Sequence, residues 1–134
     1  MRIEPSSTIP IFQQIADAIR GAVAAGIYRP GDPIPSIRAQ AVKLIINPNT
    51  IKRAYDELER EGLIVSRKGL GMFVTERGLD VARTRTEKDV RATFAHAIAV
   101  GRAAHLDKPH IDEAYRSAWG PDGREGPARN GDTT

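Results

Sequence analysis

The segment Asn47–Gly62, NPNTIKRAYDELEREG, is the part of this sequence from which the fold is best predicted. It begins with Asn-Pro, which combines a side-chain acceptor for free N–H groups with a ring preset for the first helical turn. It ends at Gly62, the residue type that most easily adopts the left-handed conformation just past a helix. Between these ends, apolar residues recur at helical spacing, namely Ile51, Ala54, Tyr55 and Leu58. We therefore predict an amphipathic helix with one buried face.

The polar face of this helix changes character along its length. Its first half carries hydrogen-bond donors, Asn49, Thr50, Lys52 and Arg53, and its second half carries carboxylates, Asp56, Glu57, Glu59 and Glu61. A helix that is rich in donors only near its N-terminus is suited to entering a DNA major groove end-first, where the helix dipole also favours phosphates. A solvated amphipathic helix explains this segment equally well, so the rest of the chain must decide.

Two further helices are predicted on the N-terminal side. An apolar pattern that opens at Pro10 and ends near Gly26 indicates a first helix with one buried face. Prolines and glycine make residues 28–33 a turn, and Ile34-Pro35 suits a very short edge strand. Ser36 is a good N-cap for a second helix, whose inward residues we expect to be Ile37, Ala41, Leu44 and Ile45. The short gap before Pro48 makes the second and third helices a helix-turn-helix.

After Gly62 the apolar period changes from helical to extended. Residues 63–67 and 71–75 are β-prone runs around Lys68-Gly69-Leu70, which predicts a hairpin with a basic tip. A basic loop is often merely solvated, but this one directly follows the helix-turn-helix, so Arg67 and Lys68 are expected near a flanking phosphate or minor groove. The predicted fold class is mainly α with a small β-hairpin (α+β): a winged helix-turn-helix over residues 9–77.

Composition and charge agree with a DNA-binding protein and exclude several other classes. The 134 residues have a net charge of +3, and residues 1–77 hold this whole excess, with eleven Lys or Arg against eight Asp or Glu. Residues 78–134 hold nine of each sign. No apolar run approaches the ~20 residues that a membrane span requires. The chain has no Cys, so it has no disulfide or thiolate metal site, and we expect a cytoplasmic protein.

Together these motifs resemble the DNA-binding domain of the GntR family of bacterial transcription regulators. The resemblance covers residues 9–76 and is carried by IPIFQQIADAIRGAVAAGIYRPGDPIPS, by SIR at residues 36–38, by NPNTIKRAYDELEREGLI and by RKGLGMFV. It implies that the following residues lie against DNA: Ser36, Arg38, Asn47, Asn49, Thr50, Lys52, Arg53, Lys68 and Gly69. One departure is Gln40, because the family usually has a buried Leu there, and we expect looser packing around it.

The second half of the chain predicts a helical dimerisation region over residues 78–119. Residues 78–86 are expected to be a polar bridge to a fourth helix, and a short fifth helix follows Asp107-Lys108-Pro109. Two helices enclose little core alone, so their apolar faces need a partner. Packing against the chain's own winged helix is one solution, and we favour a homodimer that matches a palindromic operator. The predicted dimerisation residues are Val90, Phe94, Ala97, Ile98, Gly101, Ile111 and Tyr115. Residues 120–134 are predicted to be a disordered tail.

The shortness of this region resembles the YtrA subfamily, whose members carry a two-helix dimerisation appendage. That resemblance implies control of a membrane-transporter operon. We predict a regulator, with repression as the default, and the alternative is a protein–protein adaptor that uses the winged helix without DNA. A small-molecule effector would fit a cleft lined by Phe94, Tyr115 and Trp119, although packing is the simpler explanation for these aromatic residues.

No enzyme motif is present in the sequence. It contains no P-loop, no nucleophile motif and no dinucleotide fingerprint, so we predict neither catalysis nor a cofactor. The histidines, His96, His105 and His110, lie near Asp107, Asp112 and Glu113 in the sequence, but no pair of them has a recognised metal-ligand spacing. We therefore expect surface or interface histidines and no metal site.

Overall fold

The computed structural model describes residues 1–120. The predicted tail therefore lies outside the described residues, except for Gly120. The chain divides into a first unit, residues 1–89, and a second unit that begins at Val90. No helix among the described residues is long and apolar enough to cross a bilayer.

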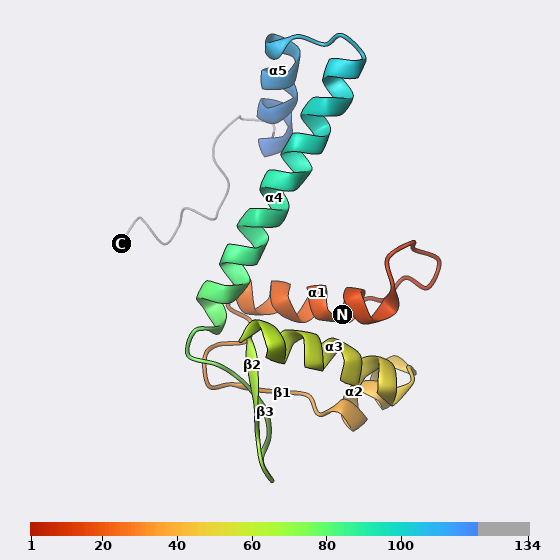
Figure 1. Ribbon diagram of the computed structural model, residues 1–134, viewed down its shortest axis with the longest axis vertical. Coiled ribbons are helices and arrows are strands. Elements are labelled where there is room, and N and C mark those ends of the chain that lie inside the picture. Colours follow the sequence, from red (N-terminus) through yellow and green to blue (C-terminus); the bar gives the residue numbers. More distant parts are fainter. Residues whose placement is uncertain (121–134) are drawn as a thin grey trace. The chain divides into compact units, whose positions relative to one another are not determined.

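Three helices form the framework of the first unit: α1 (Ile11–Ala24), α2 (Ile37–Leu44) and α3 (Pro48–Glu61). Figure 1 shows α1 and α3 side by side, with α2 joined to the start of α3 by a short turn. The bounds of α3 agree with the predicted ends. The Asn47 side chain accepts a hydrogen bond from the Asn49 N–H at 2.8 Å, and Gly62 adopts a φ of 87° just past the helix. The helix-turn-helix is thus confirmed.

Ile45 differs from its predicted inward position. The helix α2 ends at Leu44, and Ile45 adopts left-handed φ and ψ values of 56° and 53°. This conformation reverses the chain toward α3 and turns the side chain outward, so that 90% of the residue is exposed. The expectation was wrong because helical periodicity holds only as far as the helix extends.

A three-stranded antiparallel sheet completes the fold, in which the short edge strand expected at Ile34-Pro35 pairs with the predicted hairpin. The strands are β1 (Pro33–Ile34), β2 (Ile64–Arg67) and β3 (Gly71–Val74), in the order β1-β3-β2. The β2–β3 hairpin projects away from α1 (Figure 1). Its tip closes through a 2.8 Å hydrogen bond from the Leu70 N–H to the Arg67 carbonyl, and Gly69 supplies the φ of 77° that this turn requires.

The core of the first unit lies between α1, α3 and the sheet. The predicted buried face of α3 is confirmed, since Ile51, Ala54, Tyr55 and Leu58 are each at most 1% exposed. They pack with residues of α1, of the sheet and of the chain that follows it, namely Ile15, Ile19, Val23, Ile34, Leu63, Ile64, Val74 and Ala82. This close packing holds the apolar face of α3 in place and leaves its polar face exposed.

Gln40 is buried, as the family resemblance implies for that position, and its amide has a partner. Its side chain hydrogen-bonds the hydroxyl of Tyr55, which itself donates to the Pro35 carbonyl at 2.7 Å. Among the described residues, no buried side-chain N or O atom is left without a partner. The polar substitution is therefore accommodated by a hydrogen-bonded chain between α2, α3 and the segment before Ser36.

The predicted polar bridge is helical, because α4 (Gly78–Ala103) starts directly after the sheet. A Cβ atom on Gly78 would lie 2.6 Å from Val74 Cγ1 and 3.1 Å from the Leu63 carbonyl oxygen, so only glycine lets this helix begin so close to the sheet. The buried side of the first turns is formed by small residues, Gly78 and Ala82. This explains why no apolar stripe marks the segment in the sequence.

The second unit is an antiparallel pair formed by the C-terminal part of α4 and α5 (Lys108–Trp119). Asp107 caps α5 by accepting a hydrogen bond from the His110 N–H, and Pro109 occupies its first turn. Gly101 is buried where α4 meets α5, since a Cβ atom there would lie 2.7 Å from Ile111 Cδ1. The predicted fifth helix is thus confirmed.

Candidate nucleic-acid interface

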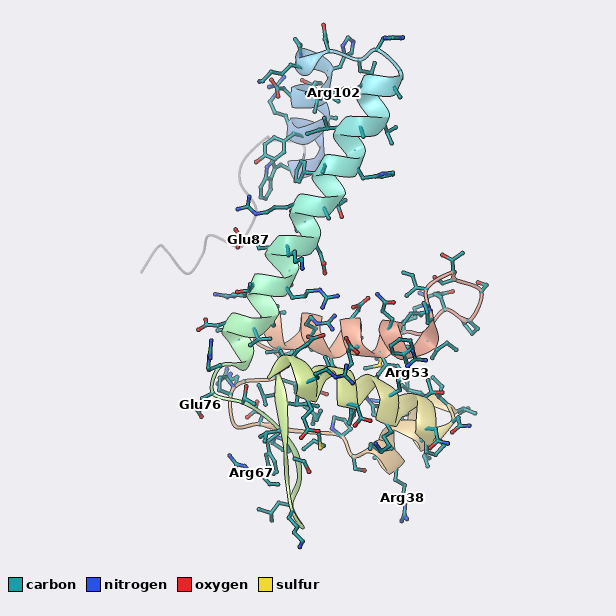
Figure 2. All side chains as sticks on the ribbon, viewed as in Figure 1. Arg38, Arg53, Arg67, Glu76, Glu87 and Arg102 are labelled. Carbon is teal, nitrogen blue, oxygen red and sulfur yellow. The ribbon has the colours of Figure 1, made fainter. Side chains whose placement is uncertain are left out.

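Arg38 and Lys68 are exposed cations on two different elements of the first unit. Arg38 lies in the first turn of α2, and Lys68 lies at the tip of the β2–β3 hairpin. In Figure 2 the Arg38 side chain extends away from α1, toward the side on which the hairpin also projects. Neither side chain has an acidic partner within residues 1–120. These two cations are therefore available to a polyanion.

The two helix caps, Ser36 and Asn47, present further donors on the first unit. Ser36 Oγ accepts a hydrogen bond from the Ala39 N–H at 3.0 Å, and Asn47 Oδ1 accepts one from the Asn49 N–H at 2.8 Å. Each cap uses an oxygen lone pair, so the Ser36 hydroxyl hydrogen and the Asn47 amide group remain free to donate. Both residues are exposed. They thus stabilise their helices while presenting donors outward.

The N-terminal half of α3 presents Asn49, Thr50, Lys52 and Arg53 at the surface. Asn49 and Arg53 are exposed and Thr50 is half-buried. Lys52 is paired with Asp56 one turn later at 2.8 Å, an exposed ion pair of a kind that contributes little to stability. The guanidinium of Arg53 instead lies 3.8 Å from the centroid of the Phe12 ring on α1. The structure therefore presents Asn49, Thr50, Lys52 and Arg53 on one helix end.

Arg67 lies at the end of β2 on the hairpin. Its guanidinium is 4.9 Å from the centroid of the Phe73 ring on the paired strand β3. Arg67, Lys68 and Gly69 are all exposed. The aromatic contact keeps the Arg67 side chain along the hairpin, where its N–H groups remain free to bond.

Most carboxylates in the second half of α3 have a cationic partner within the first unit. Asp56 pairs with Lys52, and Glu57 pairs with Arg60 at 2.9 Å. Glu59 accepts a longer hydrogen bond, of 3.4 Å, from the Ser66 N–H. These partners offset the repulsion that the acidic half would exert on a phosphate backbone. The unpaired positive charge of Arg38, Lys68 and Arg53 remains.

Glu61 joins three helices through a partly buried ion network, centred on the buried Arg20, that sequence patterns do not reveal. Arg20 on α1 donates from Nε and Nη2 to the two Glu61 oxygens at 3.0 and 2.7 Å, and from Nη1 to Asp17 at 2.6 Å. Arg85 on α4 reaches Glu61 at 3.3 Å. Burial opposes the charge of Arg20, yet the bonds to Glu61 and Asp17 outweigh it and raise the pKa of Arg20. Periodicity cannot reveal this network, because its members lie far apart in the sequence.

The second unit exposes an aromatic cluster that spans both of its helices. The ring centroids of Phe94 and Tyr115 are 6.1 Å apart, and those of Tyr115 and Trp119 are 6.0 Å apart. The aromatic rings are 40–47% exposed, and Val90 and Ile98 are exposed beside Phe94 along α4. Among the other predicted dimerisation residues, Ala97 is exposed, whereas Gly101 and Ile111 contact each other within the chain.

The histidines do not gather into a metal site within the described residues, where no group of three or more His, Asp or Glu side chains is placed to hold an ion. His110 Nδ1 instead lies 2.5 Å from Asp107 Oδ1 at the start of α5. The hydrogen bond with His110 holds the pKa of Asp107 below its usual range.

Comparison with known proteins shows which family this chain resembles. Residues 11–74 match the family described as bacterial regulatory proteins, gntR family. The HTH-type transcriptional repressor YtrA of Bacillus subtilis is 43% identical over 76 residues, which are 57% of this chain and 58% of that protein. The chain thus matches somewhat more than half the length of that relative.

Two solved structures resemble a larger part of the chain. A GntR family transcriptional regulator from Listeria monocytogenes has a TM-score of 0.72 and 31% identity over 84% of this chain and 97% of its own. YtrA from Sulfolobus acidocaldarius, a GntR-family transcription factor, has a TM-score of 0.54 and 31% identity over 88% of this chain and 96% of its own.

Proposed function

Because the chain belongs to the gntR family of bacterial regulatory proteins, among its YtrA-like members, we propose that it represses transcription by binding a palindromic operator as a homodimer. DNA binding and the regulation of transcription are properties of the family. The operator symmetry, the dimer and the repression are our proposal, as is the control of a transporter operon, which rests on the family resemblance alone.

One observation supports the proposal: Arg38 on α2 and Lys68 at the hairpin tip are exposed cations in the same unit as the donor-rich end of α3. Arg38 and Lys68 are exposed without an acidic partner in residues 1–120, whereas three of the four carboxylates of α3 form ion pairs inside the first unit. An unpaired cation on α2 and another on the hairpin tip would suit contacts with a major groove and an adjacent minor groove. A protein-binding scaffold has no need of this separation of charge.

The donors suggest two kinds of contact. We assign base edges, or close backbone contacts, to Arg38, Asn49 and Thr50, since Arg and Asn form the bidentate contacts that distinguish bases. The remaining donors would hold the register through phosphates or the groove edge: Ser36, Asn47, Lys52, Arg53, Arg67, Lys68 and the Gly69 backbone.

Two substitutions separate these roles. Arg38→Ala is expected to cost ~1–3 kcal/mol of operator binding while the chain stays folded, because one base contact is lost.

Lys68→Ala is expected to weaken binding to all duplexes alike and to flatten the salt slope by about one unit. Titrations of labelled promoter fragments at matched salt measure both effects. Unchanged operator affinity in the Arg38 variant, or a sequence-selective loss in the Lys68 variant, would refute the assigned role.

The adaptor is the competing function. A winged helix used only as a protein-binding scaffold predicts no salt-dependent binding to promoter fragments, whereas a regulator predicts a steep dependence. The exposed, unpaired state of Arg38 and Lys68 favours the regulator, because an adaptor gains nothing from cations at these positions.

A further inference from the structure

We propose that Phe12 is a positioning residue for DNA binding, and that its ring holds the Arg53 guanidinium against a backbone phosphate at the edge of the major groove. This inference rests on the proposed function, because it requires α3 to meet duplex DNA. It adds Phe12 of α1, a helix outside the helix-turn-helix, to the residues that position the protein on DNA.

The geometry of the pair is that of a stacked cation. Arg53 Cζ lies 3.8 Å from the centroid of the Phe12 ring, which is the contact expected when a guanidinium lies over an aromatic face. Phe12 is partly buried against the core of the first unit, so its ring has a fixed place on α1. A stacked guanidinium keeps its N–H groups free at the edge of its plane. The ring therefore restricts Arg53 without consuming its donors.

Arg53 differs in this respect from its neighbour Lys52. Lys52 is paired with Asp56, whereas Arg53 has no carboxylate partner and no side-chain hydrogen bond in residues 1–120. A cation that is fixed by an aromatic ring alone is both preordered and unneutralised. Preordering lowers the conformational entropy lost when a ligand is bound.

The surroundings of Arg53 suit a phosphate. A surface hollow of about 410 Å³ is lined by Ile11, Phe12, Asn49, Thr50 and Arg53. The polar side chains of this lining are donors or neutral, and none is a carboxylate. Figure 2 shows Arg53 near the N-terminal end of α3, well away from Arg67 on the hairpin. Arg53 and the hairpin thus offer backbone anchors on either side of the helix end that is assigned to the bases.

A double-mutant cycle on DNA affinity tests the positioning role. The probe is a mixed-sequence DNA duplex of about 30 base pairs, because phosphate contacts do not depend on sequence. Arg53→Gln is expected to reduce affinity about tenfold and to flatten the salt slope by about one unit. Phe12→Leu retains apolar bulk and is expected to reduce affinity about two- to fivefold. In the Arg53→Gln background, Phe12→Leu is expected to have no further effect.

Two controls separate positioning from packing. Phe12→Tyr retains the ring face and is expected to bind as the unsubstituted chain does. Affinities are compared at equal folded fraction, measured by circular dichroism, so that a loss of stability is not mistaken for a loss of contact. A purely structural Phe12 would instead lower affinity by the same factor with or without Arg53.

Each remaining outcome is decisive. Unchanged affinity and salt slope in Arg53→Gln, or equal effects of Phe12→Leu in both backgrounds, overturn the inference while leaving the regulator intact. Failure of the unsubstituted chain to bind the duplex overturns the proposed function and this inference together. Coupling between the two substitutions, with rescue by Phe12→Tyr, supports the inference.

Discussion

Ile45 holds a β-branched side chain in the left-handed region of backbone space, with a φ of 56°. For such a residue this conformation costs roughly 1–2 kcal/mol, because Cβ approaches the following carbonyl oxygen. Since 90% of the residue is exposed, little burial offsets that cost. The tight turn between α2 and α3 requires the conformation, and the chain tolerates the strain.

Replacing Ile45 with glycine is therefore expected to stabilise the chain by about 1 kcal/mol, after the larger entropy of an unfolded glycine is subtracted. Urea denaturation measures the difference. Gly62→Ala is the matched control with the opposite sign, because Gly62 has a φ of 87° just past α3. A loss of stability in Ile45→Gly would show that the exposed side chain makes contacts that the strain argument omits.

Tyr55 makes the stability of the chain sensitive to alkali. Burial raises the pKa of its hydroxyl, and the hydrogen bond from Gln40 opposes this only in part. In the unfolded chain the hydroxyl titrates near a pKa of about 10, so above that pH the unfolded state loses its proton first. The contribution of Tyr55 is therefore fully present below about pH 10 and is lost progressively as the pH rises further.

The corresponding prediction compares Tyr55→Phe with the unsubstituted chain across pH. At pH 7 the substitution is expected to cost about 1–3 kcal/mol, because the Gln40 amide and the Pro35 carbonyl lose their partner. Above pH 10 the difference is expected to shrink. Thermal unfolding at pH 7, 10 and about 11 measures it. A constant difference over this range would exclude Tyr55 as the group that titrates.

The Arg20–Glu61 ion pair links α1 to α3, and Arg85 links Glu61 to α4. Arg20→Met is expected to destabilise the first unit by about 3 kcal/mol, because Glu61 keeps only its longer contact with Arg85. Arg60→Met breaks the exposed Arg60–Glu57 pair instead and is expected to cost less than about 0.5 kcal/mol. Chemical denaturation compares the two variants, and equal losses would argue against a special role for the buried pair.

The elements also differ in how far the sequence predicts them. The ends of α3 were predictable because Asn47 and Gly62 act locally, through a cap and a left-handed residue. The start of α4 was not, since Gly78 fits against the sheet through a close approach that no periodicity expresses. The strand β1 was expected as an edge, but its pairing with β3 is a contact between distant residues.

The candidate site follows the same rule. The exposure of Arg38, Asn49 and Lys68 was expected from their motif positions and is found in the structure, and their contacts with DNA stay a prediction. The stacking of Arg53 on Phe12 was not predictable, because it joins α1 to α3, which are separated in the sequence by β1 and α2, and it leaves no pattern in either helix. Interactions within one helix or turn can be predicted from the sequence, whereas interactions between elements can be identified only once the fold is known.

The exposed aromatic cluster of the second unit is the proposed dimer surface. Phe94→Ser is expected to convert a dimer to monomers, because Phe94 contacts Tyr115 at the centre of the cluster. Val100→Ser is the matched control, since Val100 is also exposed on α4 but points about 120° away around the helix. Sedimentation equilibrium measures both. A monomeric unsubstituted chain, or equal behaviour of the two variants, would contradict the proposed surface.

The proposed surface for duplex DNA consists of the N-terminal end of α3 together with the β2–β3 hairpin. Its most direct test is the affinity of the intact chain for a fragment of its own upstream region, measured over a range of salt concentrations. With several cationic contacts, the slope of log affinity against log salt is expected to be about −4 or steeper. Binding that is absent, or that does not change with salt, would contradict the proposal.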